Sequence, residues 1–186
     1  MTTRWISAVV CLAAGLCLAG SGPATELVVK DVDGVPRHLL DPGEKAATVL
    51  VFYWHDCPIS NSYAPELNRL CASHTNVAFY VVQVDPELTP AAAREHARTF
   101  DLHAPVLLDT QHHLVNRFHA TVTPEIVVVA KDGKVLYRGR IDDGYAAPGK
   151  KRAAVTQHDL RDALDAIAAG RPIKTPETTA IGCLIQ

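Results

Sequence analysis

The sequence has little excess charge of either sign, which limits the partners that it can attract. It holds 18 basic against 20 acidic residues, a formal net charge of −2. Proteins that bind nucleic acid or anionic membranes usually do so through a strongly basic surface. We therefore expect neither of these partners. Internal repeats and low-complexity segments are also absent, and 186 residues with 48% hydrophobic content are sufficient for one domain with a full core.

The sequence also lacks an apolar run long enough for a transmembrane helix. The longest apolar stretch, residues 5–19, is about 15 residues long, whereas a span needs roughly 20. Arg4 precedes this stretch and small residues follow it up to Ala24, a pattern that is typical of a cleavable export signal. We predict that residues 1–24 form a signal peptide. The mature chain is then periplasmic or extracellular and has no stable membrane anchor.

Cysteine is scarce, and its number restricts the pairing. Cys11 and Cys17 lie in the predicted signal, so the mature chain keeps Cys57, Cys71 and Cys183. Disulfides can persist outside the cytoplasm. An odd count leaves at least one free thiol unless two chains are linked.

Apolar patterns predict an α/β domain over residues 25–170 and a tail over residues 171–186. Residues 46–54 are almost all apolar, which is typical of a central strand that is buried on both faces. A helix of about four turns is expected directly after Cys57 and Pro58. The same patterns predict further strands at 26–32, 77–84, 105–109, 125–130 and 135–140. Further helices are predicted at 91–100, 111–119 and 156–168, and Thr156 and Asp159 form a capping box at the start of the last one. Residues 144–151 are predicted to be a loop.

Cys57 is the candidate nucleophile because it lies between a buried strand and the start of a helix. Unpaired N–H groups at a helix start stabilise a thiolate, so we expect a pKa below that of a free thiol. Pro58 fits the first helical position, where an N–H is not needed. The alternative is an inert buried cysteine.

Three segments carry a family resemblance. Residues 52–60 read Phe-Tyr-Trp-His-Asp-Cys-Pro-Ile-Ser, and Val122-Thr123-Pro124 and residues 131–135 follow downstream. Together they resemble the thioredoxin-like redoxin family over roughly residues 26–170. The extra helix and strand expected near residues 91–109 resemble the branch that contains thiol-specific antioxidant proteins and exported thiol–disulfide oxidoreductases. The resemblance implies a thioredoxin-like fold, in which helices flank a central mixed β-sheet. It also implies a cis bond between Thr123 and Pro124, with Pro124 facing Cys57.

The sequence departs from both activities of that family. Ser60 occupies the place of the second cysteine in a Cys-x-x-Cys motif, so the usual local disulfide cannot form. The peroxidatic pattern expects proline seven residues before the cysteine and Thr or Ser three before it, where this chain has Leu50 and Trp54.

Cys183 is the candidate resolving cysteine. Gly182 gives the backbone next to it freedom for a close approach, and similar exported redoxins carry a Gly-Cys pair near the C-terminus. A bridge between Cys57 and Cys183 and a free tail thiol remain the two alternatives. Cys71 is a poor partner, because fourteen residues along one helix separate it from Cys57 by roughly 21 Å and a disulfide needs Cα atoms within about 7 Å.

Histidines supply the other candidate groups. His55 precedes Cys57 by two residues and is a candidate proton relay, since histidine changes charge near neutral pH; the alternative is a solvent-facing loop residue. His112 and His119 would lie about 10 Å apart along a helix, too far to share one metal ion, so we expect exposed helical histidines and neither a metal nor a cofactor.

Four functions fit these residues. The first is an enzyme that exchanges thiols with a disulfide-containing protein through Cys57, resolved by Cys183 or an external thiol reductant. The second is a thiol peroxidase with a peroxide substrate. The third is a non-catalytic module that docks an extended peptide beside Pro124. Metal delivery through Cys57 and nearby histidines is the fourth and weakest hypothesis.

Overall fold

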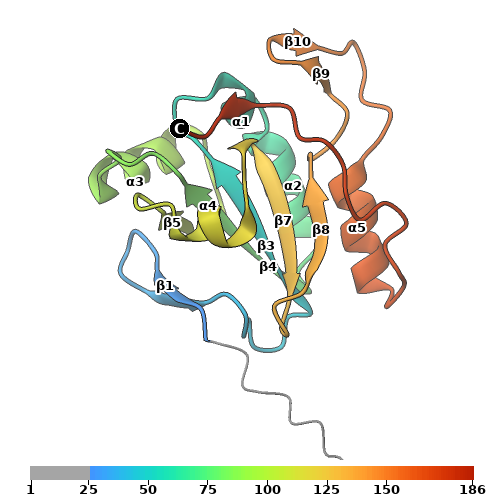
Figure 1. Cartoon of the computed structure of the whole chain (residues 1–186), viewed down its shortest axis with the longest axis horizontal. Helices are drawn as coiled ribbons and strands as arrows, with labels where there is room; N and C mark the ends of the chain where they lie inside the picture. Colours follow the sequence, from blue (N-terminus) through green and yellow to red (C-terminus); the bar gives the residue numbers. More distant parts are fainter. Residues whose placement is uncertain (1–25) are drawn as a thin grey trace, which may run out of the picture.

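A computed structural model describes residues 26–186, so the predicted signal peptide lies outside the described residues. Its centre is a five-stranded mixed sheet in the order β5-β4-β3-β7-β8 (Figure 1). The strands are β3 (Ala47–Tyr53), β4 (Val77–Gln83), β5 (Val106–Leu108), β7 (Glu125–Ala130) and β8 (Val135–Gly139). β4 runs parallel to β3 and β5, whereas β7 is antiparallel to β3 and β8. The predicted thioredoxin-like α/β fold with a central mixed sheet is confirmed.

β3 is the middle strand of the sheet, and every one of its side chains is buried. Val49, Val51 and Tyr53 belong to the core on one face of the sheet, which includes residues of the helices α2 (Ala64–Ser73) and α5 (Asp159–Ala168). Leu50 and Phe52 point to the opposite core, which includes residues of the helix α4 (His113–Phe118). A strand that is covered on both faces needs a continuous apolar sequence, which explains the pattern of residues 46–54.

The helix after Cys57 is divided, so the prediction of one continuous helix was wrong. It consists of α1 (Pro58–Ser62) and α2 (Ala64–Ser73), separated by Tyr63. The N–H of Tyr63 donates to the carbonyl of Ser60 at 3.0 Å, a tight three-residue turn. Pro65 has no N–H to donate to the carbonyl four residues earlier, which interrupts the helical ladder at this point.

The inserted helix and strand are present. The helix α3 (Pro90–Thr99) is capped by Thr89, whose hydroxyl accepts from the N–H of Ala92 at 3.2 Å, and β5 follows. The next helix, α4 (His113–Phe118), is shorter than predicted because His112 and His119 adopt left-handed backbone angles, with φ of 55° and 52°. These two residues therefore end the helix and do not lie within it.

Residues 141–168 differ from the prediction at two points. Residues 144–151 form a hairpin, β9 (Tyr145–Ala147) and β10 (Lys150–Lys151), and not an irregular loop. Pro148 and Gly149, whose φ is 72°, supply its turn. The helix α5 (Asp159–Ala168) starts after His158, because the hydroxyl of Thr156 donates to Asp143 at 2.6 Å and does not form the predicted capping box.

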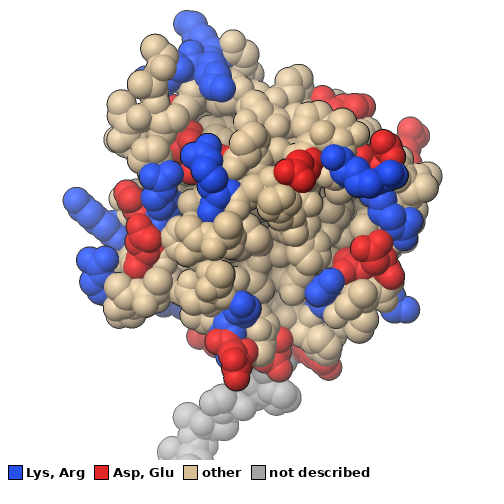
Figure 2. Space-filling view, turned by 180° about the vertical axis from the view of Figure 1, so that it is seen from behind, with Lys and Arg blue, Asp and Glu red and all other residues tan. Residues whose placement is uncertain are grey.

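Short strand pairs complete the fold. β1 (Val28–Lys30) pairs with β2 (Pro36–His38), and β6 (Val122–Thr123) pairs with β11 (Cys183–Leu184). After α5 the tail runs past β8 and ends beside α1 (Figure 1). On the face shown in Figure 2, basic and acidic residues are interspersed. Within residues 26–186, no helix has both the length and the apolar content needed to cross a membrane.

Candidate active site

Cys57 lies where the central strand passes into α1. It is the N-cap residue of α1, with extended backbone angles, and Pro58 takes a first-turn position as predicted. The side chain is only 1% exposed. The N–H of Asn61 donates to the carbonyl of Cys57 at 3.0 Å, which fixes the residue at the start of the helix. The nucleophile candidate therefore has a rigid position on the core.

Thr123, which precedes Pro124, lies directly against Cys57. The peptide bond between Thr123 and Pro124 is cis, as the family resemblance implies. The sulfur of Cys57 is 3.2 Å from the carbonyl oxygen of Thr123. Thr123 is fully buried between β3 and the tail strand, and its hydroxyl has no hydrogen-bond partner among the described residues.

Cys183 forms a disulfide with Cys57, so of the two alternatives for the tail cysteine the structure has the bridge. The Cα atoms are 6.1 Å apart across a sequence separation of 126 residues. The tail is held there as strand β11, in which Cys183 lies opposite Thr123 and Leu184 opposite Val122. One residue further, the N–H of Ile185 donates to the carbonyl of Thr121 at 3.0 Å. The strand pairing was not visible in the sequence, because two residues carry no periodicity.

Cys71 lies on α2 and is the one cysteine among residues 26–186 without a bridge. It is half-buried and packs against the core. Burial raises the pKa of its thiol, which favours the neutral form. This environment agrees with the packing role that its place on the apolar stripe predicts.

His55 lies between two carboxylates at the edge of the site, and its buried Nδ1 makes no hydrogen bond among the described residues. Its Nδ1 lies 3.3 Å from Asp85 and its Nε2 lies 3.4 Å from Asp56. The side chain is 23% exposed. His55 is thus a partly covered residue and not a solvent-facing loop side chain.

A buried polar network behind Cys57 was missed by sequence reasoning. The amide oxygen of Asn61 accepts from the hydroxyl of Tyr53 and from Nε2 of His96, both at 2.9 Å. The other nitrogen of His96 lies 3.3 Å from the side-chain nitrogen of Gln83. Burial, and next the charge of His55, lower the pKa of His96, so this residue stays neutral between its two partners. The signal available was the helical spacing of Ala93, His96 and Ala97, which puts the histidine on the inner face of α3.

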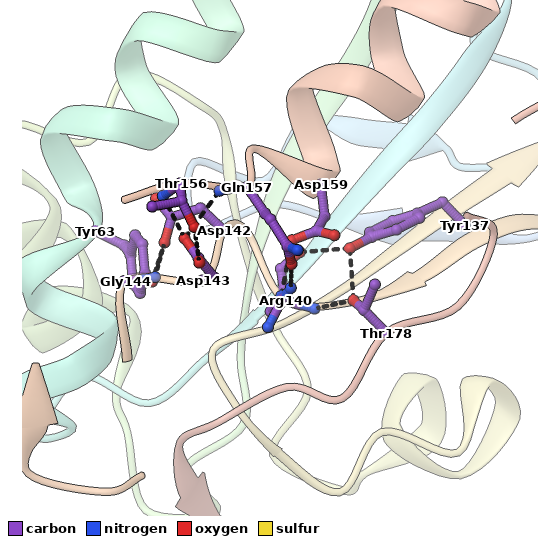
Figure 3. Close-up of polar contacts among 10 residues, drawn as sticks. All are labelled: Tyr63, Tyr137, Arg140, Asp142, Asp143, Gly144, Thr156, Gln157, Asp159 and Thr178. Atoms are coloured by element: carbon purple, nitrogen blue, oxygen red, sulfur yellow. Dashed lines mark hydrogen bonds and ion pairs between the residues drawn. The ribbon is translucent and has the colours of Figure 1, made fainter. Parts of the chain in front are cut away.

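On the other side of Pro124, a loop of acidic residues covers Tyr63. The hydroxyl of Tyr63 donates to Asp142 at 2.5 Å, and the N–H of Gly144 donates to the same carboxylate at 2.8 Å (Figure 3). Hydrogen bonds lower the pKa of the adjacent Asp143, first the one from the hydroxyl of Thr156 and then those from the backbone of the same segment. The loop that carries the β9–β10 hairpin is thereby fixed beside the site.

The histidine cluster does not assemble. The prediction that His112 is an exposed helical histidine was wrong. This residue is half-buried, and its Nε2 atom lies 2.7 Å from the carbonyl oxygen of Val84. His113 and His119 are exposed. Over residues 26–186, no group of three His, Cys, Asp or Glu side chains is arranged to hold a metal ion.

Two solved structures cover nearly the whole of this fold. An uncharacterised conserved protein from Geobacillus kaustophilus matches with a TM-score of 0.76 and 29% identity, covering 88% of this chain and 89% of that one. A hypothetical protein from Sinorhizobium meliloti 1021 matches with a TM-score of 0.72 and 25% identity, covering 87% and 91%. A secreted disulfide oxidoreductase from Mycobacterium tuberculosis, with a TM-score of 0.56 and 19% identity over 76% of this chain and 96% of that one, shares the fold.

Sequence comparison gives the family. The thiol–disulfide oxidoreductase ResA of Bacillus cereus is 25% identical over 114 residues, which are 61% of this chain, and the match spans 65% of the length of that relative. The profile of the AhpC/TSA family matches residues 21–138, more than half of the chain. The chain belongs to the AhpC/TSA family of redoxins.

Proposed function

We propose that the protein is an exported thiol–disulfide oxidoreductase in which Cys57 is the nucleophile and Cys183 the resolving cysteine. One observation carries the proposal: the cysteine at the start of α1, against Thr123 and Pro124, is bridged to a cysteine of the tail. The bridge replaces the local disulfide that Ser60 prevents. It supplies the second thiol that a two-electron exchange requires.

The reductive direction runs in two steps. The Cys57 thiolate attacks one sulfur of a substrate disulfide, so that a mixed disulfide forms and the first substrate thiolate leaves. The Cys183 thiolate then attacks the Cys57 sulfur, which releases the second substrate thiolate and forms the Cys57–Cys183 bridge. Two electrons pass to the substrate, and a dithiol reductant outside this chain restores both thiols by the reverse exchange.

The surrounding residues have distinct proposed roles. The N–H groups at the start of α1 favour the Cys57 thiolate. Thr123 and Pro124 form the wall against which a partner sulfur is aligned. His55, held by Asp85 and Asp56, passes protons between the thiols and solvent. The proposed cycle uses the two thiols alone and no further cofactor.

Export is the second part of the proposal. It rests on the sequence pattern of residues 1–24, and the secreted Mycobacterium tuberculosis protein of the same fold is in keeping with it. The mature chain would consist of the redoxin domain, residues 25–170, and the tail, residues 171–186. Expression with the native N-terminus followed by N-terminal sequencing of the periplasmic fraction tests this: a mature chain that starts near residue 25 supports export, and an intact cytoplasmic chain contradicts it.

Thiol peroxidase activity is the competing function, and membership in the AhpC/TSA family is the observation that favours it. In that reaction the Cys57 thiolate takes one oxygen from a peroxide, leaving an alcohol or water, and Cys183 displaces water from the resulting sulfenic acid to form the same bridge. Leu50 and Trp54 replace the residues that the peroxidatic pattern expects. We therefore rank disulfide exchange first.

The rates of bridge formation separate the two reactions. The reduced protein is mixed with oxidised glutathione or with hydrogen peroxide, quenched in acid, and the Cys57–Cys183 peptide pair is quantified by mass spectrometry without reduction. If the protein is a disulfide-exchange enzyme, oxidised glutathione at micromolar to millimolar concentrations forms the Cys57–Cys183 bridge faster than hydrogen peroxide does at the same concentrations. A faster reaction with peroxide, through a sulfenic acid at Cys57, would support the peroxidase instead.

A further inference from the structure

The tail of the protein pairs with β6 as a short extended strand. Cys183 and Leu184 pair with Thr123 and Val122 in an antiparallel register. The Leu184 side chain is 70% exposed, whereas its neighbours Cys183 and Ile185 are half-buried. Such alternation is what an added edge strand shows: the backbone supplies hydrogen bonds, and every second side chain supplies selectivity.

The residue before the tail cysteine must be small. A Cβ atom on Gly182 would lie 2.0 Å from the carbonyl oxygen and 2.5 Å from the carbonyl carbon of Thr123. These are backbone atoms of the buried segment beside Pro124, which cannot move aside cheaply. Any side chain at this position would therefore push the strand away from β6.

The second residue after the cysteine enters an apolar surrounding. Ile185 packs against the core that contains Leu50, Phe52 and residues of α4. With Trp54, Val84 and Pro86 it borders a cavity of about 240 Å³, which Asp85, Glu87 and Gln186 also line. The tail therefore carries three matched features in a row: glycine, a cysteine on Cys57, and an apolar residue at the second position after the cysteine.

A separate anchor holds the tail upstream of these features (Figure 3). The hydroxyl of Thr178 accepts from the N–H of Arg140 at 3.0 Å and is 2.8 Å from the hydroxyl of Tyr137. The N–H of Thr178 donates to the carbonyl of Arg138 at 2.9 Å. Gly139 makes room for this crossing, since a Cβ atom there would lie 2.3 Å from the carbonyl oxygen of Thr178. This anchor does not depend on the disulfide.

The short segment between Thr178 and Cys183 allows the end of the tail to leave β6 while Cys183 stays within reach of Cys57. The five residues from Thr178 to Cys183 can span at most roughly 17 Å when extended. Once the bridge is reduced, Cys183 can leave β6 and still remain within reach of Cys57. The tail thus has a fixed part at Thr178 and a movable part over residues 179–186.

We propose that the tail segment Ile181–Ile185 is an internal copy of the substrate. In the substrate, an extended polypeptide that binds at the edge of β6, the cysteine is preceded by glycine and followed, at the second position, by an apolar residue. The tail and the substrate occupy this edge in turn, and the tail moves about Thr178 as its pivot. This inference rests on the proposed function. The inference adds the sequence class of the substrate to that function. It also explains why Cys183 resolves the mixed disulfide: the returning tail replaces the substrate segment on β6, and its Cys183 thiolate attacks the Cys57 sulfur.

The first test compares two peptides on the full-length Cys183→Ser protein, which stops at the mixed disulfide. Both have the sequence Ala-Ile-x-Cys-Leu-Ile with the cysteine activated as a disulfide with thionitrobenzoate, and x is glycine or valine. The glycine peptide is expected to react with Cys57 at least about tenfold faster, because the added side chain overpacks the strand against Thr123. Equal rates for the two peptides would overturn the proposed selectivity.

Oxidised glutathione distinguishes a failure of this inference from a failure of the proposed function. It lacks the strand-forming sequence, so its reaction with Cys57 reports the nucleophile alone. If glutathione reacts and the two peptides do not differ, the internal-copy proposal is wrong and the exchange function stands. If neither glutathione nor either peptide reacts, the exchange function itself is wrong, and the inference falls with it.

The second test uses the tail itself. Gly182→Val is expected to slow formation of the Cys57–Cys183 bridge about tenfold, and its reaction with oxidised glutathione at Cys57 stays at least as fast as in the wild type. Thr179→Val is the matched control, since it adds no clash and changes an exposed residue of the same tail. Wild-type bridge formation in Gly182→Val, with the fold intact by circular dichroism, contradicts the proposal.

Discussion

The two bridged cysteines lie in very different parts of the molecule. Cys57 follows a seven-residue strand that is buried throughout, and it is itself 1% exposed. Cys183 belongs to a two-residue strand near the end of a tail in which exposed and half-buried residues predominate. One sulfur is therefore fixed by the core, whereas the other is held by a few backbone hydrogen bonds and by the bridge. In the proposed redox cycle, the tail is therefore the part that moves, and the nucleophile stays in place.

Removal of the movable sulfur gives the largest expected effect. Cys183→Ser is predicted to retain the first exchange step but lose multiple turnover, because no internal thiol attacks the mixed disulfide. The stalled adduct at Cys57 is measured by mass spectrometry, and turnover by reduction of a disulfide-linked fluorescent peptide. Cys71→Ser is the control and should behave as the wild type. Normal turnover in Cys183→Ser would show that the tail thiol is not needed.

Reduction of the Cys57–Cys183 bridge gives the second-largest expected effect, a decrease in the free energy of unfolding. A cross-link over a sequence separation of 126 residues is expected to stabilise the fold by up to about 5 kcal/mol through the entropy of the unfolded chain. Urea unfolding of the oxidised and reduced protein measures the difference. Equal midpoints for the two forms would mean that the bridge does not restrict the unfolded chain in the expected way.

The tail anchor should give a smaller effect. Thr178→Val removes the hydrogen bonds to Tyr137 and Arg140 while keeping the size of the side chain. This change lowers the free energy with which the tail binds to the domain by about 1–2 kcal/mol. Bridge formation should slow several-fold, because the free end of the tail is less well positioned. Thr179→Val is again the matched control. If both variants close the bridge at the wild-type rate, Thr178 is not the pivot.

The smallest expected effect concerns pH and the fixed half of the site. Burial lowers the pKa of His96, so below about pH 6.5 the unfolded chain binds a proton at this position that the folded protein does not. His96 therefore makes the free energy of unfolding decrease as the pH falls from near 6.5 towards the lowered pKa. His96→Gln should show a shallower decrease in urea unfolding between pH 7 and pH 5. The control His113→Gln changes an exposed histidine and should keep the wild-type slope.

The fixed half of the site could be predicted from sequence because its signals are local. A continuous apolar stretch predicts β3, and the proline after Cys57 places the cysteine at a helix start. The cap at Thr89 likewise predicts the start of α3. In each case the information lies within a few neighbouring residues.

The movable half could not be predicted in the same way, because its structure depends on contacts between distant segments. The pairing of Cys183 with Thr123 leaves no mark on a two-residue strand. The requirement for Gly182 comes from a carbonyl that precedes it by almost sixty residues, so the sequence shows only that a glycine is present. The same holds for the contacts of Asn61 with Tyr53 and His96, because these three residues come from three different elements, α1, β3 and α3.

The central claim is that the Cys57–Cys183 bridge is a reversible redox couple and not a structural cross-link. The most direct test equilibrates the native protein with buffers of oxidised and reduced dithiothreitol or glutathione, and measures the fraction of the bridge by mass spectrometry after acid quenching. The claim predicts one two-electron transition in the folded protein, with a midpoint between about −120 and −270 mV, the range of exchange-active thioredoxin-fold proteins. A bridge that stays oxidised to below about −300 mV, or opens only after unfolding, would contradict it.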